Sequence, residues 1–341
     1  MFVFTVVTNL FAQETDSTKR DSPLELSGSV DTYYKYDFSG QANIGTSFAN
    51  DHNSFSLGMF NFIASKTVGK ASFVADIAFG PRNSSSVPSD IENQPGIQNL
   101  YIEYAFTDKF SMTAGYMGTF VGYEVISPTG NFNYSTSYLF TNGPFQNAGI
   151  RFNYAFSDKV SVMAGIFDDW NVYKQDDGVK VSSVGGQFAI TPVENWDVYL
   201  NFISGDSNGK EFDITTGYQI SDAFYLGLNA AMWSYDDAGI ISKFTGAALY
   251  AKYAVSDAVV LGVRGESFST ENTGYIGYGL TSGLEAEKVN SLTFSANIGS
   301  GSLKFIPEIR FDSASDDVFL NSDIAPSKSA AQGVLAAVFS F

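Results

Sequence analysis

Cysteine is absent from this sequence of 341 residues, and histidine occurs once, as His52. Without cysteine the chain cannot form disulfides, thiol nucleophiles or cysteine-ligated zinc sites. A hydrolase that relies on imidazole would have to recruit His52, which lies in a loop-like segment and is expected to be an ordinary surface residue. We therefore predict that the chain is not an enzyme and that it has no dedicated metal or cofactor site.

Basic residues are also few: 19 Lys and Arg stand against 36 Asp and Glu, and the formal net charge is -17. The sequence has no Lys/Arg stripe, which argues against nucleic acid as a partner because phosphates are held by such stripes. Charged residues of both signs amount to 16%, below the roughly 25% that is usual for soluble domains. Much of the surface is therefore expected not to face water.

Long apolar runs are missing as well, although 44% of the residues are hydrophobic and 16% are aromatic. A helical membrane protein needs apolar spans of roughly 20 residues, so the sequence excludes that class. Apolar and polar residues alternate instead. This alternation is typical of a transmembrane barrel, whose strands face lipid on one side and the lumen on the other.

A strand-turn-strand pattern recurs at residues 104–110, 154–160 and 253–259. In each copy an alternating strand ends, a Ser/Thr-Asp pair such as Thr107-Asp108 bonds the local backbone, and another alternating strand begins. The pattern predicts hairpins with minimal turns. Aromatic residues flank these turns, as Tyr104 and Tyr154 do, and we interpret them as a girdle at the membrane interface. Cross-strand aromatic packing in a soluble sheet is the alternative.

Connections of two lengths alternate along the chain. Short ones are expected near 66–70, 107–108, 157–158, 191–195, 221–222, 256–257 and 299–302, and long ones near 39–52, 80–95, 118–145, 169–180, 205–210, 234–240, 269–288 and 313–329. This count implies about sixteen strands, roughly 14 to 18. The predicted fold is an all-β, transmembrane, antiparallel up-and-down barrel with short periplasmic turns, long extracellular loops and a water-filled interior.

Alternation also assigns the two faces of each strand. Along 196–203, the side chains of Trp196, Leu200 and Phe202 are predicted to face lipid. Along 303–312, Glu308 and Arg310 must face the lumen, because an Arg on the lipid face at the bilayer midplane costs about 2 to 4 kcal/mol. The same reasoning turns the following side chains inward: Asp31, Lys35, Asp76, Glu103, Arg151, Asn153, Arg264 and Glu266.

The two ends of the sequence carry targeting signals. Residues 1–12 are interpreted as a partial signal peptide with Ala12 before the cleavage point, or as a disordered apolar terminus; no basic residue precedes them, so translation starts further upstream or the signal is a fragment. Residues 13–23 form a polar leader, and 24–341 form a single barrel domain. The last strand ends on Phe341, in the apolar face of an alternating segment, and this resembles the signal that the barrel-assembly machinery reads on its clients.

Three stretches carry a resemblance to a known family: GYMGTFVGYE at 115–124, NFNYSTSY at 131–138 and GPFQNAGIR at 143–151. With them the chain resembles the β-barrel porin family of the OmpL-like type (beta-barrel porin-2). At 168–171 that family tends to have an Asn-Gly-Trp-like turn, and Asp169 in the middle of this turn is a departure. The resemblance implies a channel in the outer membrane of Gram-negative bacteria. It bears on fold and location more than on the transported solute.

The segment 118–145 joins the fifth and sixth predicted strands. In porins of about sixteen strands the loop at this position folds into the barrel and narrows the pore, so we expect the same here; a loop folded outward is the alternative. The predicted constriction residues are Glu124, Asn131, Asn133, Tyr134 and Tyr138 on the loop, opposed by Arg151, Arg264 and Arg310 on the wall. Such charges would set a transverse field that governs selectivity.

The leading interpretation is therefore an outer-membrane porin that lets small hydrophilic solutes or ions diffuse passively. An adhesin, a receptor or a plugged, non-conducting barrel is the alternative; a barrel enzyme comes third, and a soluble β-propeller last because the Ser/Thr-Asp turns are unevenly spaced.

The expected partners follow from this interpretation. They are membrane lipids, lipopolysaccharide, the assembly machinery and small hydrophilic solutes. Carboxylate pairs at loop-side strand ends, such as Asp236-Asp237, either bridge lipopolysaccharide phosphates through a divalent cation or are simply solvated. The sequence leaves a homotrimer open.

Overall fold

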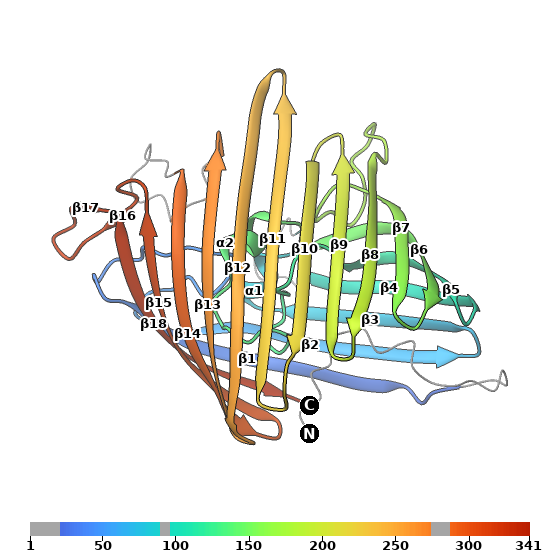
Figure 1. The fold of residues 1–341 in the computed structure, drawn as a ribbon, viewed down its shortest axis with the longest axis horizontal. Helices are drawn as coiled ribbons and strands as arrows, with labels where there is room; N and C mark the ends of the chain where they lie inside the picture. Colours follow the sequence, from blue (N-terminus) through green and yellow to red (C-terminus); the bar gives the residue numbers. More distant parts are fainter. Residues whose placement is uncertain (1–20, 89–95, 274–286) are drawn as a thin grey trace.

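Sixteen antiparallel strands close into one barrel, which confirms the predicted fold (Figure 1). The computed structural model describes residues 21–88, 96–273 and 287–341. The first eight strands are β1 (Glu25–Asp37), β2 (Ser54–Val68), β3 (Ala71–Phe79), β4 (Gly96–Thr107), β5 (Phe110–Gly118), β6 (Gln146–Ser157), β7 (Val160–Phe167) and β8 (Ser183–Val193). The others are β9 (Trp196–Gly205), β10 (Gly209–Gln219), β11 (Phe224–Asp237), β12 (Ile240–Ser256), β13 (Val259–Glu271), β14 (Lys288–Ser300), β15 (Leu303–Ala314) and β18 (Ser329–Ser340).

Each strand pairs with its neighbours in sequence, and β1 pairs with β18 to close the ring. The chain end lies beside the tight turns, since the Ser340 amide donates to the Ser302 carbonyl at 2.8 Å. Two short helices lie in the long loops, α1 (Pro81–Ser84) and α2 (Tyr138–Asn142), together with the small hairpin of β16 (Phe319–Leu320) and β17 (Pro326–Ser327). In the described residues no helix is long and apolar enough to cross a membrane.

The recurrent Ser/Thr-Asp pattern forms the tight turns. The Thr107 hydroxyl accepts the Phe110 amide at 3.0 Å, and the Ser157 hydroxyl accepts the Lys159 amide at 3.2 Å. The register shifts by one residue in the same place, between Ala105 and Thr107 in the first copy. A hydroxyl at the turn thus satisfies amides that the strand ladder leaves unpaired.

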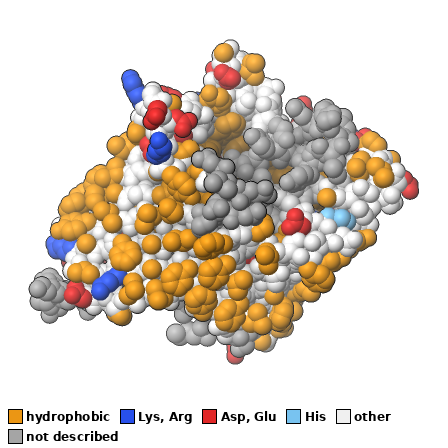
Figure 2. Space-filling view, turned by 180° about the vertical axis from the view of Figure 1, so that it is seen from behind, with side chains coloured by type: hydrophobic (Ala, Val, Ile, Leu, Met, Phe, Trp, Pro, Cys, Tyr) orange, Lys and Arg blue, Asp and Glu red, His pale blue; other side chains and the backbone are white. Residues whose placement is uncertain are grey.

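The predicted faces are confirmed where burial distinguishes them. On β15 the inward Glu308, Arg310 and Asp312 are 6%, 0% and 2% exposed, whereas the outward Phe305 and Phe311 are 46% and 44% exposed. Figure 2 shows apolar side chains spread over the outer wall, with acidic and basic side chains mainly towards its borders. The wall therefore suits contact with hydrocarbon over its central part.

Two of the predicted long loops are wrong. Strands β9 and β10 are joined by residues 206–208, and β11 and β12 are joined only by Ala238 and Gly239. Both residues of this second turn have positive φ, 51° for Ala238 and 94° for Gly239. Such a turn matches the twist of a hairpin, so strand pairing continues to Asp237 opposite Ile240 instead of stopping at the polar residues. The predicted signal peptide (1–12) lies outside the described residues, as does nearly all of the leader.

Candidate functional site

Residues 119–145, here called the inner loop, connect β5 to β6 and lie against the lumen side of the wall, with α2 inside the barrel (Figure 1). Ser137 begins α2 by accepting the Phe140 amide with its hydroxyl. The Ser137 amide and hydroxyl both donate to Glu124, at 2.7 and 2.8 Å. Glu124 therefore fixes the start of α2 from within the loop.

Wall carboxylates receive the backbone amides of the inner loop. Glu308 on β15 accepts from the amides of Tyr134 and Ser135, at 2.8 and 3.1 Å. Glu266 on β13 accepts from the amides of Tyr138 and Leu139, at 3.0 and 2.9 Å. Hydrogen bonds to an ionised acceptor are about twice as strong as neutral ones. Each of the two carboxylates therefore holds two adjacent amides of the loop.

Wall arginines bind the carbonyl groups of the same segment. Arg264 on β13 donates to Oε1 of Glu124 at 2.6 Å and to the Ser135 carbonyl at 2.7 Å. Arg310 on β15 donates to the Thr136 carbonyl at 2.8 Å and to both oxygens of Asp312, at 2.8 and 3.0 Å. Both guanidinium groups are fully buried, so they anchor the loop and are not free to line an open pore.

Two tyrosines complete the attachment. The Tyr134 hydroxyl donates to Asp31 on β1, and the Tyr138 hydroxyl donates to Asp312 at 2.7 Å. Burial, followed by the neighbouring carboxylate, raises the pKa of each phenol well above its ordinary value. Both tyrosines thus remain neutral hydrogen-bond donors at neutral pH.

The predicted constriction residues fall into two groups. Seven of them are gathered in this attachment or within the loop: Asn133 donates to Ser295 on β14 at 2.8 Å, and Asn131 closes a turn on the backbone of Val125. Arg151 on β6 is not among them. It has Glu103 and Tyr101 as its ionisable neighbours, and its Nε has no hydrogen-bond partner within the described part of the chain.

Other loops brace the inner loop from the extracellular side. Arg82 of α1 donates to the Ile126 carbonyl at 3.2 Å and lies over the rings of Phe48 and Tyr134, 4.6 and 4.9 Å from their centroids. The Ser47 amide donates to the Thr141 hydroxyl at 3.1 Å. The connections after β1 and β3 therefore pack onto the same loop.

Sequence reasoning placed Asp31, Glu266 and Glu308 inward but did not assign them to the site. The signal that could have identified them is the set of inward carboxylates on three strands, because a loop folded into the barrel has many backbone amides that need acceptors. His52 accepts the Asp37 amide at 3.1 Å. Among the described residues, no group of three or more His, Cys, Asp or Glu side chains is placed to hold a metal ion.

The hydrogen bonds of residues 122–139 to the wall all reach one arc of the barrel. Among the described contacts they end on β10, β11, β13, β14, β15 and β1. Strands β4 and β6 stand eight positions around the ring of sixteen from β12 and β14, and so lie opposite this arc. Glu103 on β4 and Arg151 on β6 are half-buried there.

The family model of beta-barrel porin-2, OmpL-like (BBP2), matches residues 23–341. The chain belongs to this family. It is an outer-membrane barrel of the porin type, located in the bacterial outer membrane, as the sequence predicted. No curated protein has a sequence that matches this porin.

Solved structures with the same fold are outer-membrane proteins. The outer membrane channel DcaP of Acinetobacter baumannii has a TM-score of 0.65 and 12% identity, covering 93% of this porin and 97% of DcaP. The anion-selective porin from Comamonas acidovorans has a TM-score of 0.61 and 12% identity, covering 94% and 100%. The trimer form of OmpT of Vibrio cholerae has a TM-score of 0.58 and 11% identity, covering 94% and 99%. At these identities the likeness concerns the fold alone.

Proposed function

We propose that this porin forms a water-filled channel for the passive diffusion of small hydrophilic solutes or ions. The observation that carries the proposal is the one-sided attachment of residues 122–139 of the inner loop, whose bonds to the wall gather on the arc from β10 through β15 to β1. A loop held against one wall narrows the lumen and leaves passage along the other. Solutes then pass between the inner loop and the lumen side of β3 to β6.

Charges of both signs line this passage. Arg151 and Glu103 face the lumen from β6 and β4, where both are register partners of Thr113 on β5. Selectivity in such a passage follows its radius and the sign of the charges along it. In this proposal Arg151 is the constriction arginine, whereas Arg264 and Arg310 hold the loop in place.

The test is conductance of the purified protein in a planar bilayer, combined with solute size exclusion in liposome swelling. Discrete open steps that scale with salt concentration are expected. Neutralising Arg151 changes ion selectivity, and neutralising Glu124 changes the open-state noise because the loop loosens. Absence of any steps from correctly folded protein would reject the channel.

A plugged, non-conducting barrel is the second candidate, and burial favours it. Inward side chains on well-separated walls are nearly inaccessible: Asp76 on β3 is 7% exposed, Thr113 on β5 is 2%, Asn201 on β9 is 4% and Thr293 on β14 is 0%. Replacing residues 125–133 by a short Gly linker separates the two candidates. A plugged barrel conducts only after this replacement, whereas a porin conducts before it and more strongly afterwards.

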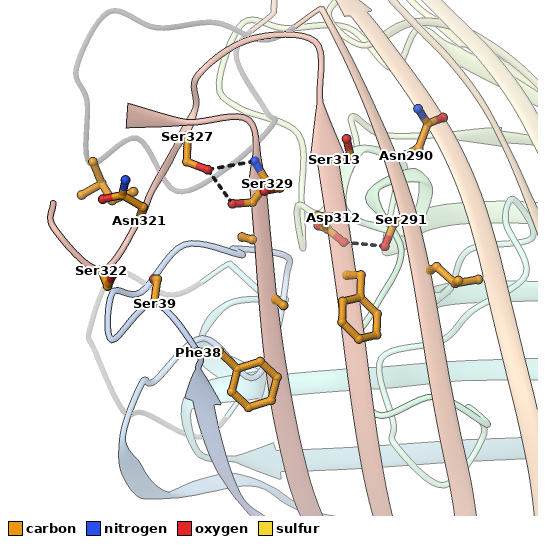
Figure 3. A pocket seen from close by; sticks show the side chains of 15 residues that line it. Phe38, Ser39, Asn290, Ser291, Asp312, Ser313, Asn321, Ser322, Ser327 and Ser329 are labelled. Carbon is orange, nitrogen blue, oxygen red and sulfur yellow. Dashed lines mark hydrogen bonds between the residues drawn. The ribbon is translucent and has the colours of Figure 1, made fainter. Parts of the chain in front are cut away.

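Lipid is a further part of the proposal. A groove of about 650 Å³ opens on the outer wall at the extracellular ends of β14, β15 and β18 (Figure 3). Leu292 and Phe311 line it where the wall meets hydrocarbon, and Asn290, Ser313 and Ser329 line it nearer the rim. The apolar end suits an acyl chain and the hydroxyl-rich end a sugar headgroup, so we expect the glycolipid of the outer leaflet, lipopolysaccharide, to occupy it.

Two substitutions on the outward face of β18 test this assignment. Ala331→Trp fills the groove and is expected to abolish co-purification of lipopolysaccharide, while Ala337→Trp, on the same face outside the groove, leaves it unchanged. Equal retention of lipopolysaccharide by the two variants would contradict the assignment of the groove to this lipid.

The oligomeric state is proposed to be a homotrimer. Phe55 and Leu57 on the outward face of β2 are 89% and 68% exposed, the largest exposures of apolar side chains on the barrel strands. Such a pair is suited to contact with a second copy. Double substitution of both residues by Ser is expected to convert trimers into monomers in native mass spectrometry from detergent.

A further inference from the structure

A small cavity lies where the inner loop meets β10 and β11, at one end of the arc that binds the loop. Its volume is about 10 Å³, and Glu211, Asp213 and Asn229 line it from the wall, with Gly122 and Gly143 on the loop side. One water molecule needs roughly 10 to 15 Å³ by the same measure. The cavity therefore has room for one small ion or one water molecule, and for nothing larger.

The charges around this cavity are all of one sign. Glu211 and Asp213 stand two apart on β10, so their side chains share the lumen face, and they are only 3% and 5% exposed. No Lys or Arg lines the cavity, and none of the ion pairs found in the described residues includes either carboxylate. Two buried carboxylates without a positive partner carry a large desolvation cost that a bound cation would remove.

The two carboxylates differ in their hydrogen bonds. Asp213 accepts the Gly122 amide at 3.2 Å, the Asn201 amide group at 2.6 Å and the Asn229 amide group. Oε2 of Glu211 has no hydrogen-bond partner in the described chain, although it is buried. Leu139 and Phe140 of α2 adjoin the cavity as well, and the Leu139 carbonyl accepts the Gly143 amide. One carboxylate oxygen, Oε2 of Glu211, is thus buried beside this cavity without a donor in the described chain.

We propose that Glu211 and Asp213 bind one calcium ion, which ties the inner loop to β10. Calcium accepts carboxylate and carbonyl oxygens in flexible geometry at roughly 2.3 to 2.6 Å. Magnesium keeps several of its own water molecules and requires near-octahedral geometry, for which a cavity of about 10 Å³ has no room. Calcium is therefore preferred. Its role is to hold the side of the loop that the Arg264 and Arg310 contacts do not reach.

The direct measurement uses full-length protein folded in detergent micelles, with calcium alone as the probe. Isothermal titration after treatment with a chelator is expected to show one saturable site per chain, with magnesium binding at least about tenfold more weakly. Addition of calcium is expected to raise the thermal unfolding midpoint. Binding that does not saturate at millimolar calcium would overturn the proposal.

Substitutions locate the ion. Glu211→Gln and Asp213→Asn, which keep the shape of each side chain, are expected to weaken calcium binding at least about tenfold. Asp222→Asn is the matched control, because it removes one exposed carboxylate from the connection between β10 and β11, and it leaves binding unchanged. Equal weakening in all three variants, or unchanged binding in Glu211→Gln, would show that the ion is not at this cavity.

A luminescence measurement on protein with both carboxylates intact tests the site even if the Glu211 and Asp213 variants fail to fold. Trp233 on β11 is the register partner of Glu211, so terbium in this site is expected to be excited through its indole. Calcium then displaces the signal, and Trp233→Phe abolishes it without abolishing calcium binding. Terbium emission that is independent of Trp233 would overturn the assignment. These measurements do not depend on conduction. A barrel that binds calcium but shows no conductance would therefore reject the proposed channel and still support the calcium site.

Discussion

Arg264 on β13 and Glu124 in the inner loop form a buried ion pair, with Nη1 and Oε1 2.6 Å apart and side chains 0% and 4% exposed. The same guanidinium binds the Ser135 carbonyl, and the same carboxylate binds the start of α2. This pair therefore couples the position of the inner loop to the wall of the barrel. Glu124 and Arg264 were first expected to shape the electric field in the pore, and in the structure they bind each other and hold the loop.

Removing Glu124 should destabilise the attachment strongly. Glu124→Ala leaves Arg264 buried without its carboxylate, which typically costs about 3 to 5 kcal/mol. Urea unfolding of protein folded in micelles measures the loss. The double variant Glu124→Gln with Arg264→Met removes both charges and is expected to be more stable than Glu124→Ala. A double variant that is less stable than Glu124→Ala would contradict the coupling.

Two glycines on β13 provide a matched pair for the loop contact. A Cβ at Gly262 would overlap the ring of Phe132 in the inner loop, whereas a Cβ at Gly265 would meet no atom within 4 Å. Gly262→Ala is thus expected to displace Phe132 and to change single-channel conductance, while Gly265→Ala leaves both conductance and stability unchanged. Equal behaviour of the two variants would show that Phe132 is not held against the wall.

The barrel could be predicted from the sequence because its rules are local. Alternation fixes the face of each strand, and hydroxyl-Asp turns such as Thr107-Asp108 fix where hairpins reverse, so the strand number and all seven tight turns follow. The tight turn between β11 and β12 was predicted as a long loop, because Ala238 adopts a positive φ that its residue type does not indicate.

The partners of the site could not be predicted in the same way. Glu308 is 174 positions from the Tyr134 amide that it binds, and Glu266 is 128 positions from the Tyr138 amide. Inward orientation was evident for both, but which loop atoms they meet depends on how the inner loop folds across the lumen. Arg151 and Arg264 are indistinguishable by alternation alone, although one is proposed to line the passage and the other is buried under the loop.

Ion selectivity should respond to the charges of the proposed passage. Arg151→Gln is expected to shift the reversal potential in a potassium chloride gradient towards cation preference, and Glu103→Gln towards anion preference, because each removes one sign of charge from the same region. Lys243→Gln, on the exposed end of β12, is the control for a change in net charge. Equal shifts from the control and from Arg151→Gln would place the passage elsewhere.

The terminal residue separates barrel closure from delivery to the membrane. The Phe341 amide donates to the Gly28 carbonyl and the Gly28 amide donates to the Phe341 carbonyl, both at 3.1 Å, so backbone groups close the ring here. Phe341 is 53% exposed, and the tip of its phenyl ring lies beside Gly28, so the side chain adds only a local contact to this closure. Phe341→Ala is therefore expected to refold in detergent as well as the unaltered chain. In cells it is expected to reach the outer membrane severalfold less, since we propose that the assembly machinery recognises the phenyl ring.

The control is Phe339→Ala, which changes an outward neighbour that is 41% exposed and should have little effect on refolding or on assembly in cells. If Phe341→Ala lowered refolding in detergent to the same extent as assembly in cells, the ring would act in closure and not in recognition.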